Sequence, residues 1–363
     1  MQVKPTDSSS ESASESIVTD GSGSKTSSFS FETSSSNIEV TWNERLRDFY
    51  EEFIYKPGLV AWDDRRTRIG AAIMFVYVSM GVIAWLGAWL GFYPEPTTNQ
   101  AERGLQPFQT LDAPLGTTQS GEDVLAMAIH ATPEMLIMVT AGGIFATGVA
   151  VLTGTLAGYK GGSVDRAVTS FSDVAMSIPG LPLIMVLAVV FRPRNPILIG
   201  ILLTINYWAG LGRSIRSQVL TLREEPYVEA SRTMGVSTRR ILTKDIIPNL
   251  MPFVLVNFAN AARYVVFASV GLYYLGILPS SVENWGLQLE NAYTQAGALV
   301  GTGALYQLLV PMVSIMGIAL SLILLAQGLD RVFNPRVRTR LAGESESVRS
   351  EETEESSKTE MMP

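Results

Sequence analysis

Residues 229–248 read EASRTMGVSTRRILTKDIIP and interrupt an otherwise apolar part of the chain. Six of these twenty residues are charged, and four of the six are cationic. Apolar runs stand on both sides, at about residues 196–212 and 252–277. A charged stretch between two such runs belongs in water, because an unpaired charge inside a bilayer costs several kcal/mol. The pattern therefore predicts a membrane protein with a hydrophilic loop at this point.

Apolar runs of similar length recur along the 363 residues. A helix needs about 20 mostly apolar residues to cross a hydrocarbon core of about 30 Å, and only helices and closed barrels satisfy their backbone groups in lipid. We expect an all-α multi-pass membrane protein with six spans, at about residues 69–92, 134–158, 171–191, 196–212, 252–277 and 308–329. Only RPRN, residues 192–195, separates the third span from the fourth, which predicts a tight helical hairpin.

Two features inside the spans predict local structure. Gly154 and Gly158 form a small-xxx-small pair, which lets two helices approach closely. Pro179 predicts a kink in the third span.

Lysine and arginine fix the expected orientation, because they stay on the cytoplasmic side of a membrane protein. With the N-terminus in the cytoplasm, only three loop cations fall on the outer side, namely Arg103, Arg192 and Arg194. We therefore expect a cell-membrane protein with both termini in the cytoplasm. Residues 229–248 become a cytoplasmic loop between spans four and five.

The two ends of the chain differ from its middle. The chain is 47% hydrophobic, yet its formal net charge is −7, so acidic and apolar residues are segregated. Residues 1–43 and 343–363 are Ser-rich and acidic, and we expect both to be disordered cytoplasmic tails. Residues 44–68 predict an amphipathic helix in the membrane interface; packing on the protein's own cytoplasmic face is the alternative. The membrane-spanning body is then residues 69–340.

The residues exclude most enzyme chemistry. There is no cysteine and a single histidine, His130, which disfavours thiol chemistry and the common zinc and haem sites. No GxxxxGK[ST] phosphate-binding loop and no HExxH motif occur. We expect a non-catalytic chain with no metal site and no cofactor of its own.

The stretch from Pro226 predicts a short helical hairpin. Pro226 suits a first helical turn, Gly235 permits a left-handed helix end, and Ser237 suits an N-cap. Ile241, Leu242 and Ile246 make an apolar stripe beside cationic residues, which is typical of a protein-docking surface. A solvated loop whose cations only set topology is the alternative.

The same stretch resembles the conserved loop of permease subunits of binding-protein-dependent ABC importers. That loop has Glu-Ala-Ala, three residues, Gly, and then a Pro-terminated end. This chain matches it with Glu229, Ala230, Ser231, Gly235, Ile247 and Pro248. The resemblance implies that these six residues form the loop that couples the permease to its ATPase.

The resemblance extends over about residues 60–340, to the dipeptide and oligopeptide class. PLGTTQSGEDVL (114–125), SDVAMSIPGLPL (172–183) and NWGLQL (284–289) have counterparts in order. The chain departs from that class at six positions. At Ala113, Thr118 and Glu122 the departures predict the loss of a polar network on the outer side. Ser231 is a small change in the loop, whereas Asp245 and Ser269 are expected to alter the coupling and the polarity of the pathway.

The resemblance implies four kinds of partner: a second homologous permease subunit, ABC ATPase subunits that bind ATP and Mg, an extracellular substrate-binding protein, and membrane lipid. It implies import of dipeptides or oligopeptides, with a metal chelate or an oligosaccharide as the alternative solute. An ATP-independent channel or carrier is the rival class, but it predicts inverted repeats or paired carboxylates within the spans, and the sequence shows neither.

A cationic residue lies within the fifth span. Arg263 follows Asn257 and Asn260 at helical spacing, which places the three on one face of a helix. An ionisable residue within a span indicates a functional site by default, so these three are candidates to line the translocation pathway. Pairing of Arg263 with an acidic group of a partner permease is the alternative.

Overall fold

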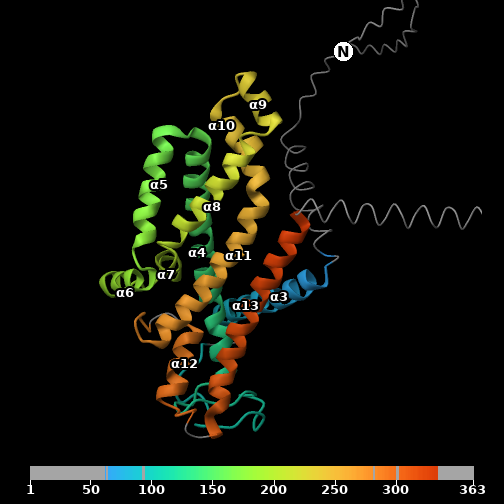
Figure 1. Cartoon of the computed structure of the whole chain (residues 1–363). Helices are drawn as coiled ribbons and strands as arrows, with labels where there is room; N and C mark the ends of the chain where they lie inside the picture. The colour runs from blue at the N-terminus through green and yellow to red at the C-terminus, as the bar shows by residue number, and fades with distance from the viewer. Residues whose placement is uncertain (1–61, 63, 92–94, 281–282, 300–301, 334–363) are drawn as a thin grey trace, which may run out of the picture. The chain divides into compact units, whose positions relative to one another are not determined.

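The computed structural model describes residues 62, 64–91, 95–280, 283–299 and 302–333. Within these ranges the chain is helical, apart from loops and a single antiparallel bridge between Thr117 and Asp123. The tails (1–43 and 343–363) and most of the expected amphipathic helix (44–68) lie outside the described residues. The helices, labelled as in Figure 1, are α3 (Arg65–Leu90), α4 (Val124–Lys160), α5 (Gly162–Ser177), α6 (Gly180–Phe191), α7 (Pro196–Leu203), α8 (Tyr207–Leu222), α9 (Pro226–Thr233), α10 (Thr238–Ile241), the π-helix η2 (Leu242–Ile246), α11 (Ile247–Tyr274), α12 (Trp285–Thr294), the 3-10 helix η3 (Thr302–Ala304) and α13 (Leu305–Phe333).

Four of these helical segments are long and apolar enough to cross a membrane: Arg65–Leu90, Val124–Lys160, Thr238–Tyr274 and Leu305–Asp330. They correspond to the expected spans one, two, five and six. The described residues reach six spans only if α5 with α6, and α7 with α8, each count as one bent span. The bends are 82° and 60°, so two of the six expected spans are not straight helices.

The first bend has the expected cause. α5 ends at Ser177, and Pro179 takes the N-cap position of α6 in an extended conformation. A proline lacks the N–H that would continue the helix and clashes with the preceding turn. The kink expected at Pro179 is confirmed, and it is a complete break. The expected short connection over residues 192–195 is also confirmed, because α6 ends at Phe191 and α7 begins at Pro196.

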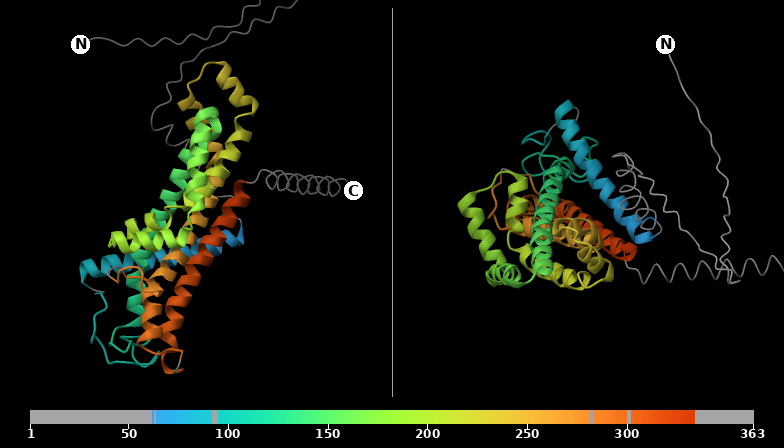
Figure 2. Two further views of the ribbon diagram at one scale, coloured as in Figure 1. Left: turned by 60° about the vertical axis from the view of Figure 1, so that its left-hand side comes forward. Right: turned by 90° about the horizontal axis from the view of Figure 1, so that it is seen from above.

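Helix α4 is the centre of the packing, and it contacts α3, α5, α7, α8, α11, α12 and α13 (Figures 1 and 2). Its contact with α8 is close because of small residues. A Cβ on Gly154 would lie 2.6 Å from the Gly212 carbonyl oxygen, and one on Gly158 would lie 2.8 Å from Val219 Cβ. The expected close packing at the Gly154 and Gly158 pair is confirmed.

The buried residues form two hydrophobic clusters. One joins α3, α4, α11, α12 and α13 around Trp285, Tyr273 and Met135. The other joins α8 to the segment after it, around Trp208, Ile215 and Ile246. The two ends of α4 therefore belong to different clusters, with α12 at its first end and α9 and α10 toward its last.

The loop before α4 is tied down by one buried threonine. Thr117 Oγ1 donates to the Glu102 carbonyl (2.6 Å), and the Thr117 carbonyl accepts from Tyr306 Oη (2.5 Å) and Gln307 Nε2 (3.1 Å). Nearby, Thr118 Oγ1 donates to Glu122 Oε2 (3.3 Å) and accepts from the Glu122 N–H (3.1 Å). Thr118 and Glu122, two of the departures from the class, therefore hydrogen-bond to each other at this end, and the loss of the class's own polar network stays a prediction.

Candidate functional site

The segment between α8 and α11 turns back on itself through a defined helix ending. α9 ends at Thr233, and Gly235 follows with φ of 75°. The Gly235 N–H donates to the Arg232 carbonyl (3.0 Å) and the Val236 N–H to the Ser231 carbonyl (3.1 Å). These two bonds make a Schellman motif, in which the left-handed residue is usually glycine because a Cβ is strained there. The left-handed turn expected at Gly235 is confirmed.

The second arm of this hairpin differs from expectation. It was expected as a short helix of its own, but residues 238–274 form one helical segment that runs through η2 into α11. Pro248 stands in the first turn of α11, directly after the π-helix. A wider π turn displaces the carbonyl that a proline ring would otherwise clash with. Ser237 does occupy the N-cap position of α10, although its side chain makes no capping hydrogen bond.

Buried apolar residues hold the hairpin against the rest of the chain. Val228, Ile241 and Ile246 are each at most 1% exposed, and they belong to one hydrophobic cluster with Ile215 and Val219 of α8. Asn249 Nδ2 also donates to Tyr227 Oη (3.2 Å), which ties α9 to α11. The apolar stripe of Ile241, Leu242 and Ile246 is therefore internal. Its expected place on an outer docking surface is wrong, because these side chains are buried in the cluster.

The outward surface of the hairpin includes most of α9 and exposed residues of the second arm. Among the residues expected to couple to the ATPase, Glu229, Ala230 and Gly235 are exposed, whereas Ser231, Ile247 and Pro248 are half-buried. On the same helix Tyr227 is 42% exposed, and Met234 at its end is 75% exposed. Two large side chains thus stand in solvent beside small ones, which is the composition of a contact surface.

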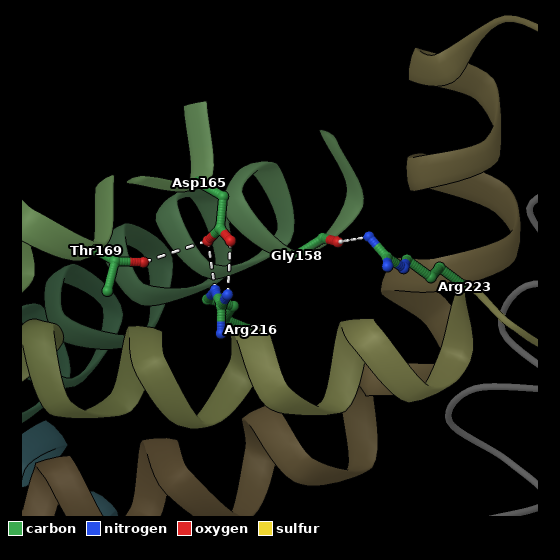
Figure 3. A network of polar contacts seen from close by, with 5 residues as sticks. All are labelled: Gly158, Asp165, Thr169, Arg216 and Arg223. Carbon is green, nitrogen blue, oxygen red and sulfur yellow. Dashed lines mark hydrogen bonds and ion pairs between the residues drawn. The ribbon is translucent and has the colours of Figure 1, made fainter. Parts of the chain in front are cut away.

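Polar contacts join α8, the helix before the hairpin, to α4 and α5, as Figure 3 shows. Asp165 of α5 binds the Arg216 guanidinium of α8 with both carboxylate oxygens; Arg216 Nη2 is 2.6 Å from Asp165 Oδ2. Thr169 Oγ1 donates to the same carboxylate (3.2 Å), and Arg223 Nη1 donates to the Gly158 carbonyl (3.2 Å). The fork of an arginine matches a carboxylate in this way and fixes geometry as well as charge. These contacts link the start of α5 and the end of α4 to α8.

The polar face of α11 lies further along the same rod. Asn257, Asn260 and Arg263 are all half-buried, and Asn257 Nδ2 donates to the Phe253 carbonyl of its own helix (2.8 Å). Among the described residues, no carboxylate lies within 4.0 Å of the Arg263 guanidinium. Its charge is therefore not neutralised within this part of the chain. Ser269, a departure from the class, is fully buried and donates to the Val266 carbonyl (2.9 Å), so it does not belong to this face.

The structure adds residues that the sequence interpretation did not select. Tyr207 and Tyr264 pack with ring centroids 5.0 Å apart, and Tyr264 directly follows Arg263 in α11. Asn206, beside Tyr207, donates from Nδ2 to the Ile178 carbonyl at the break between α5 and α6 (2.8 Å). The signal in the sequence was the polar pair Asn206 and Tyr207 inside an apolar run. The two helix breaks and the Arg263 face therefore adjoin one polar and aromatic neighbourhood.

These features together define an all-helical, multi-pass membrane protein with a hairpin whose second arm continues into one of the candidate spans. Residues 150–339 match the family model described as binding-protein-dependent transport system inner membrane component. The chain belongs to that family, and it is a non-catalytic permease component of a binding-protein-dependent ABC transporter.

Three relatives illustrate the similarity. The oligopeptide transport system permease protein OppC of Bacillus subtilis (strain 168) is 29% identical over 65% of this chain and 78% of its own length. The dipeptide transport system permease protein DppC of the same strain is 26% identical over 76% of this chain and 84% of its own. OppC of Haemophilus influenzae is 26% identical over 72% of this chain and 84% of its own length. The matches cover most of the chain, so the resemblance inferred from short motifs is confirmed.

Proposed function

We propose that this chain forms half of the translocation pathway of an ATP-driven importer and receives its drive through the hairpin, residues 229–248. The other half would come from a second homologous permease subunit. Two ATPase subunits, which bind ATP and Mg, would dock on the hairpin, and an extracellular binding protein would deliver the solute. The distribution of lysine and arginine supports a cytoplasmic position for both termini and for the hairpin.

The observation that carries this proposal is the continuity of the hairpin with a span. The exposed face of α9 is joined through the Schellman turn to residues 238–274, which are one helical rod. Val228, Ile241 and Ile246 are buried in one hydrophobic cluster with residues of α8, so a push on α9 would be passed to α8 and α11 together rather than absorbed by a loose loop. Rigid-body motion of this kind is how closure of one domain reaches another.

The polar face of α11 is the proposed contact for the solute. Asn257, Asn260 and Arg263 lie half-buried on the same rod, and Arg263 lacks a carboxylate partner among the described residues. A cation in this setting attracts an anionic group, and a peptide always carries one at its C-terminal end. The relatives are named for dipeptides and oligopeptides, and we assign the same solute class to this chain.

The docking surface can be tested without unfolding the hairpin. Removing residues 229–248 would expose Val228 and the residues of α8 that Ile241 and Ile246 cover, so a deletion would fail for structural reasons. Ala230→Arg instead places a bulky cation on the exposed face of α9. Thr294→Arg, an exposed position on α12, is the matched control.

We expect Ala230→Arg to reduce the amount of ATPase that co-purifies with the complex by about tenfold or more, because a clash and a buried charge at a docking surface cost 2 kcal/mol or more. Thr294→Arg should retain the ATPase at the level of the parent. Equal retention by both variants would show that α9 is not the docking surface.

A further inference from the structure

An open cationic cavity lies beside the hairpin. Its volume is about 630 Å³, and it is lined by the last residues of α4 and α8 and by the hairpin; the lining residues are Tyr159, Lys160, Arg223, Glu224, Arg232, Val236, Thr238 and Ile241. Three cations and a single carboxylate therefore face one space.

The charges in this cavity are incompletely paired. Arg223 Nη2 is 4.0 Å from Glu224 Oε1, and Arg223 Nη1 donates to the Gly158 carbonyl. Arg232 lies over the Tyr159 ring, with its guanidinium carbon 5.7 Å from the ring centroid. Among the described residues, neither Lys160 nor Arg232 has a carboxylate within 4.0 Å. Such a space favours a ligand that carries several negative charges close together.

The chain itself supplies a segment of that kind. Residues 344–360 contain seven glutamates against one arginine and one lysine, and Glu351, Glu352, Glu354 and Glu355 fall within five residues. Residues 1–43 are also acidic, but there successive carboxylates are at least four residues apart. The C-terminal segment therefore matches a cluster of three cations better than the N-terminal one.

The C-terminal segment also starts from the end of α13 that lies away from Thr117 and nearer to the hairpin. α13 begins beside Thr117, at the end of the bundle opposite the hairpin, and runs toward the residues that contact the start of α3. Beyond Phe333, the 18 residues to Glu351 can span about 60 Å when extended. The whole of α11 is about 42 Å long at 1.5 Å per residue, so the segment reaches far enough.

We propose that the acidic C-terminal segment, residues 344–360, binds in the cavity lined by Lys160, Arg223 and Arg232. Because Arg232 belongs to α9 while Lys160 and Arg223 end α4 and α8, the bound segment ties the hairpin to the two helices behind it. It is a restraint on the hairpin that high salt releases, since ion pairs near a surface weaken as ionic strength rises.

The absence of native cysteine permits a direct test by disulfide trapping in the purified full-length chain. Thr238→Cys places a thiol in the cavity lining, and Thr353→Cys places one among the four clustered glutamates. Thr243→Cys is the matched control: it is also an exposed threonine of the hairpin, but it does not line the cavity. Ser12→Cys, which precedes Glu15 by three residues, tests the N-terminal segment.

We expect the pair at 238 and 353 to form a disulfide about tenfold faster under mild oxidation than the pair at 243 and 353 or the pair at 238 and 12. The double variant Lys160→Gln with Arg232→Gln, or glutamine at the four clustered glutamates, should bring the rate down to the control value. A salt concentration of about 1 M should do the same, because the Debye length is then about 3 Å.

Three outcomes would overturn the proposal. One is equal rates at 238 and 243; another is a rate that survives removal of the charges, with unchanged thermal unfolding of the variant. The third is an occupant other than the C-terminal segment, which would appear either as faster trapping of the N-terminal thiol or as loss of trapping in nanodiscs of anionic lipid but not in zwitterionic ones. The assay needs neither ATPase nor solute, so its result is independent of the proposed docking on α9.

Discussion

At the scale of single residues, the packing of α4 on α8 depends on the lack of side chains. Gly154 faces the Gly212 carbonyl and Ile215, and an added Cβ would lie 2.6 Å and 2.8 Å from them. The neighbour at the shorter distance is backbone, so it cannot turn aside as a side chain would. Both helices would have to separate, and with them the base of the hairpin.

Gly154→Ala should therefore destabilise the protein by about 1–3 kcal/mol, the usual cost of overpacking. Gly148→Ala, in the same helix, is the matched control, because that position is exposed and an added Cβ has no neighbour within 4 Å. There we expect no loss, or a gain of up to about 1 kcal/mol from the better helix propensity of alanine. Thermal unfolding in detergent measures both, and equal effects of the two substitutions would contradict the packing argument.

The charge of Arg263 gives a second prediction at this scale. Arg263→Gln should raise the concentration of solute needed for half-maximal uptake by about tenfold, because a hydrogen bond to a charged group contributes about 1.5–3 kcal/mol. Arg263→Lys keeps the charge and should restore most of the affinity. Co-purification of the subunits should be unchanged in both variants. Uptake kinetics that match the parent in Arg263→Gln would show that this residue does not face the pathway.

At the scale of elements, the sequence predicted one helix break and missed the other, for physical reasons. The break at Pro179 could be predicted, because a proline interrupts a helix through its own backbone chemistry. The break after α7 falls at Thr204, Ile205 and Asn206, where no proline or glycine stands. Thr204 Oγ1 donates to the Gly142 carbonyl of α4 (3.2 Å) and Asn206 Nδ2 donates to the Ile178 carbonyl. These are tertiary contacts, which no local pattern reveals. For the same reason, the burial of Ile241 and Ile246 against α8 could not be read from their spacing.

The hydrogen bond from Asn206 predicts that the break between α5 and α6 has two independent causes. Pro179→Ala restores a backbone donor, yet the Ile178 carbonyl remains bound to Asn206, so this variant should stay bent. The double variant Pro179→Ala with Asn206→Leu should straighten the segment. Pro179→Ala with Asn195→Leu is the control, because Asn195 caps α7 away from the break.

Spin labels on cysteines at the exposed positions Val174 and Val190 measure the result by pulsed electron resonance. A straight helix separates these residues by about 24 Å along its axis, and the bend shortens that distance. The mean distance should lengthen only in the double variant with Asn206→Leu. Lengthening in Pro179→Ala alone would show that the proline is the whole cause.

At the scale of the whole molecule, the short motifs from residue 114 to residue 289 identified the family, and the family match over residues 150–339 confirms it. Pro226, Gly235 and Ser237 predicted the hairpin because turn chemistry is local. The joining of its second arm to α11 through η2 was not predicted, since a π-helix depends on how the turn is packed. This junction determines whether the hairpin behaves as a loop or as the end of a rod.

If the hairpin drives transport as the end of a rigid helix, then a more flexible junction at η2 should uncouple ATP hydrolysis from import while the complex stays assembled. Thr243 and Lys244 are exposed residues of η2, so they can be changed without opening the buried cluster. The double variant Thr243→Gly with Lys244→Gly lowers local helix stability by about 2 kcal/mol relative to alanine at both positions. Thr243→Ala with Lys244→Ala is the matched control, because it removes the same side chains and keeps the helix stiff.

We expect the glycine pair to retain its ATPase on purification, since α9 is untouched, but to import fewer solute molecules for each ATP hydrolysed in reconstituted vesicles. The alanine pair should keep the transport ratio of the parent. An unchanged ratio in the glycine pair would mean that force does not pass along the rod of residues 238–274, and that α9 acts through its contacts with α8 instead.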